Sequence, residues 1–143
     1  MSAFATHSPG GTGLEPRVAD AMHWGLMTCP SGASLRSVAA LMNDERVHCV
    51  VVIDEPSDVP SLWGVISDLD LVAAASVRRL TEQKAGGTAM TPAVTIAPDE
   101  PLEYAANLMT KHGVAHLVVV DPIEQRPIGV ISTLDLAAAL AAA

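Results

Sequence analysis

Two pairs of side chains have the types and the spacing to bind a polar ligand. Ser67 lies three residues before Asp70, and Ser132 lies three residues before Asp135. An ionised carboxylate has about four acceptor sites, so each aspartate could accept hydrogen bonds from two hydroxyl groups. A helix that begins at each serine would add unpaired N–H groups and a partial positive charge, which favour an anion such as phosphate.

The same pattern also has a purely structural interpretation. In a capping box, a serine before the first turn of a helix accepts a hydrogen bond from the N–H three residues on, and an acidic side chain at that later position accepts one from the serine N–H. This role needs no ligand, and for a single Ser-x-x-Asp it is the favoured one. The two roles are compatible, and the duplication of the pattern shifts the balance toward ligand binding.

Both pairs lie within a repeat, so the fold must position them twice. Residues 64–70 (Gly-Val-Ile-Ser-Asp-Leu-Asp) and 129–135 (Gly-Val-Ile-Ser-Thr-Leu-Asp) are identical at six of seven positions. Upstream of them, Ala21-Met22 aligns with Ala89-Met90 at an offset of 68 residues, and residues 50–54 align with 117–121 at an offset of 67. Self-similarity at a nearly fixed spacing indicates two copies of one structural unit.

Each copy is predicted to be a β-α-β-β-α unit of an α/β (α+β) fold. The second copy shows the order most clearly, with a strand at 94–96, a helix at 101–112, strands at 116–121 and 128–131, and a helix from 132. Apolar residues at helical spacing mark the first helix, and Lys111-His112 followed by Gly113 is a typical helix end. The β-branched run at 117–120 is typical of a strand covered on both faces.

The boundaries of the copies follow from composition. Residues 1–16 are rich in Gly, Ser, Thr and Pro, which predicts a flexible tail. We place the first repeat at 17–84 and the second at 85–143. A helix from Ser67 to about Lys84, closed by Gly86-Gly87, is predicted to join them, and residues 55–61 are predicted to form a loop.

Composition excludes several classes of function. Half of the 143 residues are hydrophobic, and the net charge of −8 argues against a nucleic-acid groove, which needs a basic face. The N-terminus lacks the features of a signal peptide, and no apolar run is long enough to span a membrane. We therefore expect a soluble cytoplasmic protein that binds neither nucleic acid nor membrane.

The order of elements resembles the cystathionine-β-synthase (CBS) domain family, and two copies in tandem are similar to a Bateman module. The segments that carry the resemblance are Ala89-Met-Thr-Pro92, Pro101-Leu102, His116-Leu-Val-Val-Val120 and Gly129-Val-Ile-Ser-Thr-Leu-Asp135. The resemblance covers about residues 18–140. Its most specific part is a glycine, two apolar residues, Ser or Thr and then Asp three residues later, found twice in register.

The resemblance implies a fold and a ligand. Two repeats would pack about a pseudo-twofold axis and form two clefts that bind an adenosine nucleotide (AMP, ADP or ATP) or S-adenosylmethionine as a regulatory ligand. The aspartate would accept hydrogen bonds from the ribose hydroxyls, the serine would contact ribose or phosphate, and apolar strand residues would hold the adenine. Such modules usually form homodimers and act on a partner protein, which the sequence does not identify.

Each cleft would draw residues from both copies. The first would combine Ser132, Asp135, Val130 and His116 with Met22 and Trp24. The second would combine Ser67, Asp70, Val65 and Cys49 with Thr88 and Met90. The family commonly has a basic residue where His116 and Cys49 stand, so the Asp135 cleft is the better candidate for a phosphorylated ligand, and the Asp70 cleft could be idle.

The remaining aromatic, basic and sulfur-containing side chains suggest roles of their own. Trp24 and Trp63 are expected to pack rather than stack, although Trp24 could stack on an adenine. Arg78 and Arg79 are expected on a solvated face. The histidines at 23, 48, 112 and 116 and the cysteines at 29 and 49 lack metal-ligand spacing, so no metal site is predicted.

The sequence therefore predicts a regulatory module and not an enzyme, because it has no catalytic motif such as GxSxG or a Walker A loop. The leading hypothesis is a stand-alone CBS pair that senses an adenosine-containing ligand. The alternative is a structural module with empty clefts that dimerises or docks a partner. A thiol or metal sensor built on Cys29 and Cys49 is a third and more remote hypothesis.

Overall fold

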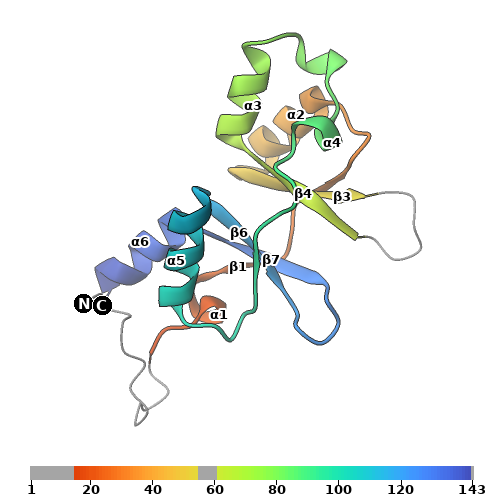
Figure 1. Ribbon diagram of the computed structural model, residues 1–143. Coiled ribbons are helices and arrows are strands. Elements are labelled where there is room, and N and C mark those ends of the chain that lie inside the picture. The colour runs from red at the N-terminus through yellow and green to blue at the C-terminus, as the bar shows by residue number, and fades with distance from the viewer. Residues whose placement is uncertain (1–14, 55–60, 143) are drawn as a thin grey trace. The chain divides into compact units, whose positions relative to one another are not determined.

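The computed structural model describes residues 15–54 and 61–142, which form two compact units (Figure 1). Within this range, one unit joins residues 15–25 to 94–142, and the other consists of residues 26–93. One unit therefore combines most of the second repeat with the opening segment of the first. The other combines most of the first repeat with the opening segment of the second. We name them the Asp135 unit and the Asp70 unit after the aspartates that they contain.

The Asp135 unit has a mixed four-stranded sheet. Its elements are α1 (Val18–Ala21), β1 (His23–Trp24), β5 (Thr95–Ile96), α5 (Leu102–His112), β6 (His116–Val120), β7 (Pro127–Ser132) and α6 (Thr133–Ala142). The strand order is β1-β7-β6-β5. The short β5 runs parallel to β6, whereas β7 is antiparallel to both of its neighbours.

The Asp70 unit repeats most of this plan with three strands. Its elements are β2 (Thr28–Pro30), α2 (Leu35–Glu45), β3 (Cys49–Asp54), β4 (Ser61–Ser67), α3 (Asp68–Ala75), a 3-10 turn η1 (Leu80–Glu82) and α4 (Ala85–Thr88). The strand order is β2-β3-β4. A single bridge between Val65 and Met90 takes the place that β1 has in the other unit.

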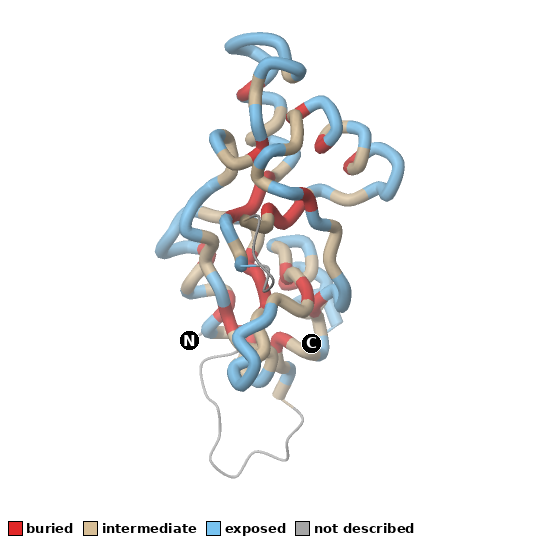
Figure 2. The backbone as a smooth tube through the Cα atoms, turned by 90° about the vertical axis from the view of Figure 1, so that its right-hand side faces the viewer, coloured by how far each residue is buried: buried red, intermediate tan, exposed pale blue. Residues whose placement is uncertain are grey.

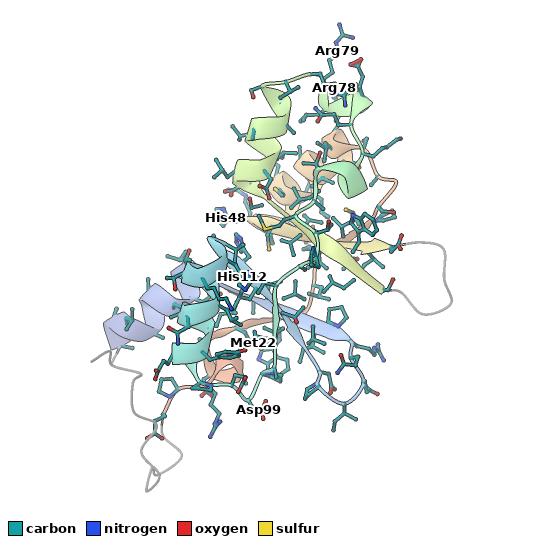
Figure 3. The ribbon with its side chains drawn as sticks, in the orientation of Figure 1. Met22, His48, Arg78, Arg79, Asp99 and His112 are labelled. Atoms are coloured by element: carbon teal, nitrogen blue, oxygen red, sulfur yellow. The ribbon has the colours of Figure 1, made fainter. Side chains whose placement is uncertain are left out.

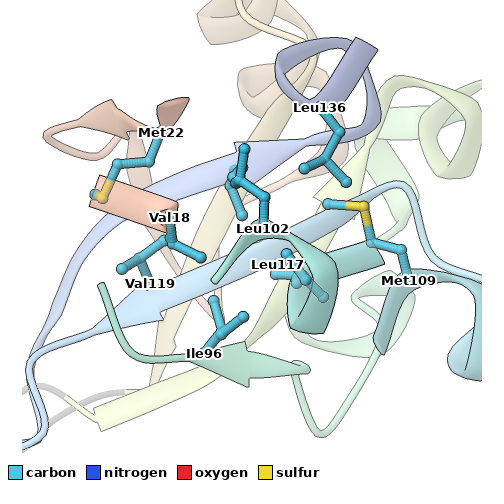
Figure 4. Close-up of a cluster of buried hydrophobic side chains, with 10 residues drawn as sticks. Val18, Met22, Ile96, Leu102, Met109, Leu117, Val119 and Leu136 are labelled. Carbon is cyan, nitrogen blue, oxygen red and sulfur yellow. The ribbon is translucent and has the colours of Figure 1, made fainter. Parts of the chain in front are cut away.

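Each unit has its own apolar core between sheet and helices. In the Asp135 unit, α5 buries Leu102, Ala105 and Met109 against Leu117 of β6, and this cluster is drawn in Figure 4. In the Asp70 unit, Leu35 of α2 is likewise fully buried. Buried positions fall on the strands and on one face of the helices, which is the pattern expected where helices cover a sheet. Figure 2 shows where the buried residues lie along the backbone.

The strands and the main helices agree with the sequence predictions. Helix α5 ends at His112, and Gly113 follows it with a φ of 63°, the left-handed conformation that glycine adopts without strain. The equivalent residue after α2 is Arg46, which takes the same conformation at a φ of 57°. Each repeat also opens with a short helix, α1 or α4, that the β-α-β-β-α prediction omits.

The predicted helix from Ser67 to Lys84 is wrong beyond its second turn. Helix α3 ends at Ala75, where the Gln83 side-chain amide donates hydrogen bonds to the carbonyls of Ala74 (2.9 Å) and Arg78 (3.0 Å). These bonds satisfy carbonyls at the helix end and fold the chain back. Gly86-Gly87 lies inside α4 rather than closing a helix. The predicted tail and loop lie mostly outside the described residues.

The offset of 68 residues for the opening segment is also wrong. Arg17 precedes α1 and bridges to Pro101, whereas Lys84 precedes α4 and bridges to Ser34. These pairs are equivalent at an offset of 67. By strand register, the residue in the first opening segment that is equivalent to Met90 is therefore His23 and not Met22. This shift by one residue changes which side chain faces the repeated aspartate.

Candidate functional site

Both Ser-x-x-Asp segments form the capping box. The Asp135 Oδ2 atom accepts hydrogen bonds from the Ser132 N–H (2.8 Å) and hydroxyl (3.0 Å), and the Asp135 N–H donates to the Ser132 Oγ (3.2 Å). At the start of α3, the Ser67 N–H donates to Asp70 Oδ2 (2.9 Å) and the Asp70 N–H to Ser67 Oγ (3.2 Å). The structural role is thus confirmed, and it uses one carboxylate oxygen of each aspartate.

The glycine of each heptapeptide lets a distant segment approach the strand. A Cβ atom on Gly129 would lie 2.2 Å from the carbonyl oxygen of His23, and one on Gly64 would lie 2.3 Å from that of Met90. Neither distance is compatible with a side chain. Glycine therefore allows the opening segment to pair with the strand that ends at the serine, which brings residues from both repeats to each aspartate.

The second oxygen of Asp135 is contacted by His23. The Nε2 atom of His23 lies 3.0 Å from Asp135 Oδ1, and the side chain of Asp135 is only 11% exposed, whereas that of His23 is 78% exposed. Pairing of β1 with β7, in which His23 stands opposite Val130, positions the imidazole. In the sequence, His23 suggested only a metal ligand, and no local pattern pointed to this contact.

The Asp70 carboxylate has different surroundings. Met90 occupies the position equivalent to His23, opposite Val65 on β4. Because a thioether cannot donate a hydrogen bond, it cannot reproduce the contact made by the imidazole. Among the residues that the structure describes, the contact made by the Asp70 side chain is with the N–H of Ser67.

The remaining predicted ligand residues lie around the same two points. His116 stands opposite Ser132 in the pairing of β6 with β7, and Cys49 stands opposite Ser67 in that of β3 with β4. Val130 is half-buried and Val65 is buried, while Thr88 ends α4 two residues before Met90. The structure thus gathers each predicted set within a single unit.

Two members of the first set differ from what the sequence suggested. Met22 is 7% exposed and belongs to the core, with its methyl group in the space left by Gly129, so it does not present a surface to a ligand. Trp24 is 62% exposed, so the expectation that it packs is wrong. Its Nε1–H donates to the Ala19 carbonyl (3.3 Å), whereas that of the less exposed Trp63 donates to the Gly86 carbonyl (2.8 Å).

Other charged side chains lie near the two ends of α3. Arg78 and Arg79 are exposed after α3 and project away from it (Figure 3), as expected. His48 lies 3.1 Å from Asp68 at the start of α3, through Nδ1 and Oδ2. This second histidine–aspartate pair is well exposed, and the carboxylate it uses is not the repeated one.

The two cysteines are not joined to each other. Cys29 is buried, and desolvation raises the pKa of its thiol, so it is largely protonated near neutral pH. In residues 15–54 and 61–142, no three His, Cys, Asp or Glu side chains are grouped so that they could hold a metal ion. None of the helices described over these ranges has the length and apolar character required to cross a membrane.

Two comparisons of the sequence give relatives. The model of the CBS domain matches residues 18–77 and 87–142. A homoserine O-acetyltransferase of Methanococcoides burtonii is 30% identical over 119 residues, and an uncharacterised protein of Methanocaldococcus jannaschii is 30% identical over 105 residues. The matches cover 83% and 72% of this chain but only 23% and 55% of those proteins.

The fold is shared with solved CBS structures. A CBS domain protein of Pyrobaculum aerophilum, solved with AMP, is 27% identical with a TM-score of 0.76, over 90% of this chain and 100% of that one. A CBS-domain protein of Agrobacterium tumefaciens is 20% identical with a TM-score of 0.79, over 91% and 97%. A CBS domain pair solved with 5′-methylthioadenosine and S-adenosyl-L-methionine is 21% identical with a TM-score of 0.77, over 90% and 98%.

Three observations agree with one another: the duplicated β-α-β-β-α plan, the heptapeptide that ends a strand at a capping box in each unit, and the two matches to the family model. The chain belongs to the CBS domain family and contains two CBS repeats.

Proposed function

We propose that this chain is a regulatory module that binds an adenosine-containing ligand at its repeated aspartates. The observation that carries the proposal is the carboxylate itself, because the capping box uses Oδ2 in both units and leaves Oδ1 outside the cap; in the Asp135 unit, Oδ1 is contacted by the exposed His23. Two neighbouring ribose hydroxyls are suitable donors for such a group. The relatives solved with AMP and with S-adenosyl-L-methionine support this class of ligand.

The surroundings of the carboxylates favour a ligand of low charge. The residue opposite each capping serine is His116 in one unit and Cys49 in the other, and neither carries a fixed positive charge. Binding of a triphosphate would require fixed cations to offset about four negative charges, on a chain whose own net charge is −8. AMP, adenosine or S-adenosylmethionine is therefore proposed ahead of ATP.

The regulatory part of the proposal follows from differential binding. A ligand changes the balance between two arrangements of a module only by as much as it binds them differently. A partner that senses one arrangement would then respond to the ligand. We propose that the module works as a homodimer and is not itself an enzyme. Any catalytic activity that it regulates would belong to a separate partner protein.

Isothermal titration with AMP, adenosine, S-adenosylmethionine and ATP tests the proposal, and Asp135→Asn and Asp70→Asn are the informative variants. Asparagine retains an oxygen for the cap but loses the charge. Hydrogen bonds to a charged group are worth roughly 1.5–3 kcal/mol, so each substitution should weaken binding at its own site about tenfold or more. Absence of heat with all four ligands, or unchanged affinity in both variants, would refute the proposal.

One observation favours a second function, that of an interaction module. Leu69 on α3 and Leu134 on α6 occupy equivalent places in the two repeats, and they are 73% and 71% exposed. Val72 and Leu140 add to the exposed apolar surface of these helices. Sedimentation of the parent chain and of the Leu69→Glu and Leu134→Glu variants would show whether these helices mediate self-association, with Asn107→Glu, at an exposed position of α5, as a control for added charge.

A further inference from the structure

The contact between His23 and Asp135 concerns the same carboxylate that the proposed function assigns to ribose. Asp135 Oδ2 is held by Ser132, so Oδ1 is the oxygen still available, and His23 Nε2 lies 3.0 Å from it. Oδ2 already accepts two hydrogen bonds from Ser132, so two ribose hydroxyls that donate to this carboxylate need both acceptor sites of Oδ1 and must displace the imidazole. The His23 side chain can move, since it is 78% exposed.

The competition is confined to one of the two sites. Both opening segments pair with their strands in the same register, His23 with Val130 and Met90 with Val65. The backbone therefore brings a side chain to each aspartate, but the methionine has neither a charge nor a proton to donate. The two sites thus share one carboxylate geometry and differ in whether a titratable group competes for it.

The charged groups around His23 are few. On α6 the ionisable side chain is Asp135 itself, and β7 consists of uncharged residues from Pro127 to Ser132. On α1, the Asp20 carboxylate accepts a hydrogen bond from the Arg17 N–H (2.8 Å) and so is already engaged. His116, on the strand beyond β7, is the other titratable group near the capping serine.

We propose that His23 competes with the hydroxyl groups of the ligand for Asp135, so that protonation of His23 weakens binding at the Asp135 site and leaves the Asp70 site unaffected. This inference rests on the proposed function. Histidine gains its charge within the physiological pH range. The imidazolium forms a charge-assisted hydrogen bond to a carboxylate, which is stronger than that of the neutral ring, so displacement costs more as the pH falls.

Titration with adenosine at pH 5.5 and pH 8.0, followed by NMR of the 15N-labelled chain, measures the two sites separately. Adenosine has no phosphate, so its own charge does not change between these pH values. The amides of Ser132 and Asp135 report one site, and those of Ser67 and Asp70 report the other as an internal control. We expect Kd at the Asp135 site to be about threefold to fivefold higher at pH 5.5, the upper range for exposed ion pairs, with no change at the Asp70 site.

Two substitutions exchange the surroundings of the sites. His23→Met copies the Asp70 unit and should remove the pH dependence, with His23→Gln as a second uncharged variant. Met90→His should confer pH dependence on the Asp70 site. His112→Gln, at the exposed end of α5, is the matched histidine control and should leave the pH dependence as in the parent. The ring resonances of His23 should shift when adenosine binds the Asp135 site.

The outcomes separate the inference from the function on which it rests. If adenosine binds the Asp135 site with the same Kd at both pH values in the parent, or if the dependence persists in His23→Met, the competition is refuted while the proposed function stands. Persistence would assign the proton to another group, such as His116. If adenosine binds neither site in the parent or in His23→Met at either pH, the inference and its part of the proposed function both fail.

Discussion

The two units place the same capping box at the end of the same strand but surround its aspartate differently. Asp135 has an imidazole against its second oxygen, whereas the equivalent position beside Asp70 is a methionine. Position 116 is a histidine and position 49 is a cysteine, so one unit has two imidazoles where the other has two sulfur-containing side chains. The two repeats thus share the residues that form the capping box and differ in the side chains that can carry charge beside it.

If the two units are equivalent in packing, truncation of equivalent core residues should destabilise both to a similar degree, and this is the largest expected effect. Leu102→Ala and Leu35→Ala remove side chains that are both 0% exposed and that begin equivalent helices. Each should lower the free energy of unfolding by about 2–5 kcal/mol. Urea unfolding, followed by circular dichroism, should give similar losses, and a loss below about 1 kcal/mol in one unit would break the equivalence.

The close approach at the two glycines is the next largest effect. Gly129→Ala and Gly64→Ala place a Cβ against the carbonyls of His23 and Met90, so strand or segment must move, at a cost of roughly 1–3 kcal/mol. Gly87→Ala is the matched control, because a Cβ there meets no atom within 4 Å, and it should change the urea midpoint little. Equal midpoints for all three variants would contradict the observed contacts.

The capping boxes should differ slightly in strength. Ser132→Ala and Ser67→Ala remove an N-cap, which costs about 1 kcal/mol. The loss should be somewhat larger for Ser132, whose hydroxyl also donates to its aspartate. Amide hydrogen exchange at Asp135 and Asp70 measures each helix start directly, and Ser→Thr variants, which retain the hydroxyl, should recover most of the protection.

The smallest expected effect is that of Cys29, which concerns the reactivity of its thiol and, at alkaline pH, a small part of the stability. Burial raises the pKa of its thiol above the ordinary value of 9.0, so little thiolate forms at pH 8. Iodoacetamide should therefore modify Cys49, which is only half-buried, well before Cys29. Because the thiol ionises less readily in the folded state than in the unfolded state, the free energy of unfolding should fall as the pH rises above about 9. This fall should be smaller in the Cys29→Ala variant.

Local signals accounted for much of the fold. Helix α5 was predictable at both ends, because Pro101 precedes its first turn and Gly113 supplies the left-handed residue at its end. Helix α3 was not, because its end depends on Gln83, which folds back from outside the helix to bind the Ala74 and Arg78 carbonyls. Nothing in the apolar pattern from Leu69 to Ala75 marks that stop.

The sequence by itself determined the duplicated unit and the two Ser-x-x-Asp capping boxes, since each depends on residues a few positions apart. Only the tertiary structure decided which side chain meets each aspartate. His23 and Val130 are far apart in the chain, and their register depends on strand pairing and on the space left by Gly129. It corresponds to an offset of 67 residues between the opening segments, whereas matching residue types suggested 68. A slip of one residue along a strand reverses the face on which every side chain lies.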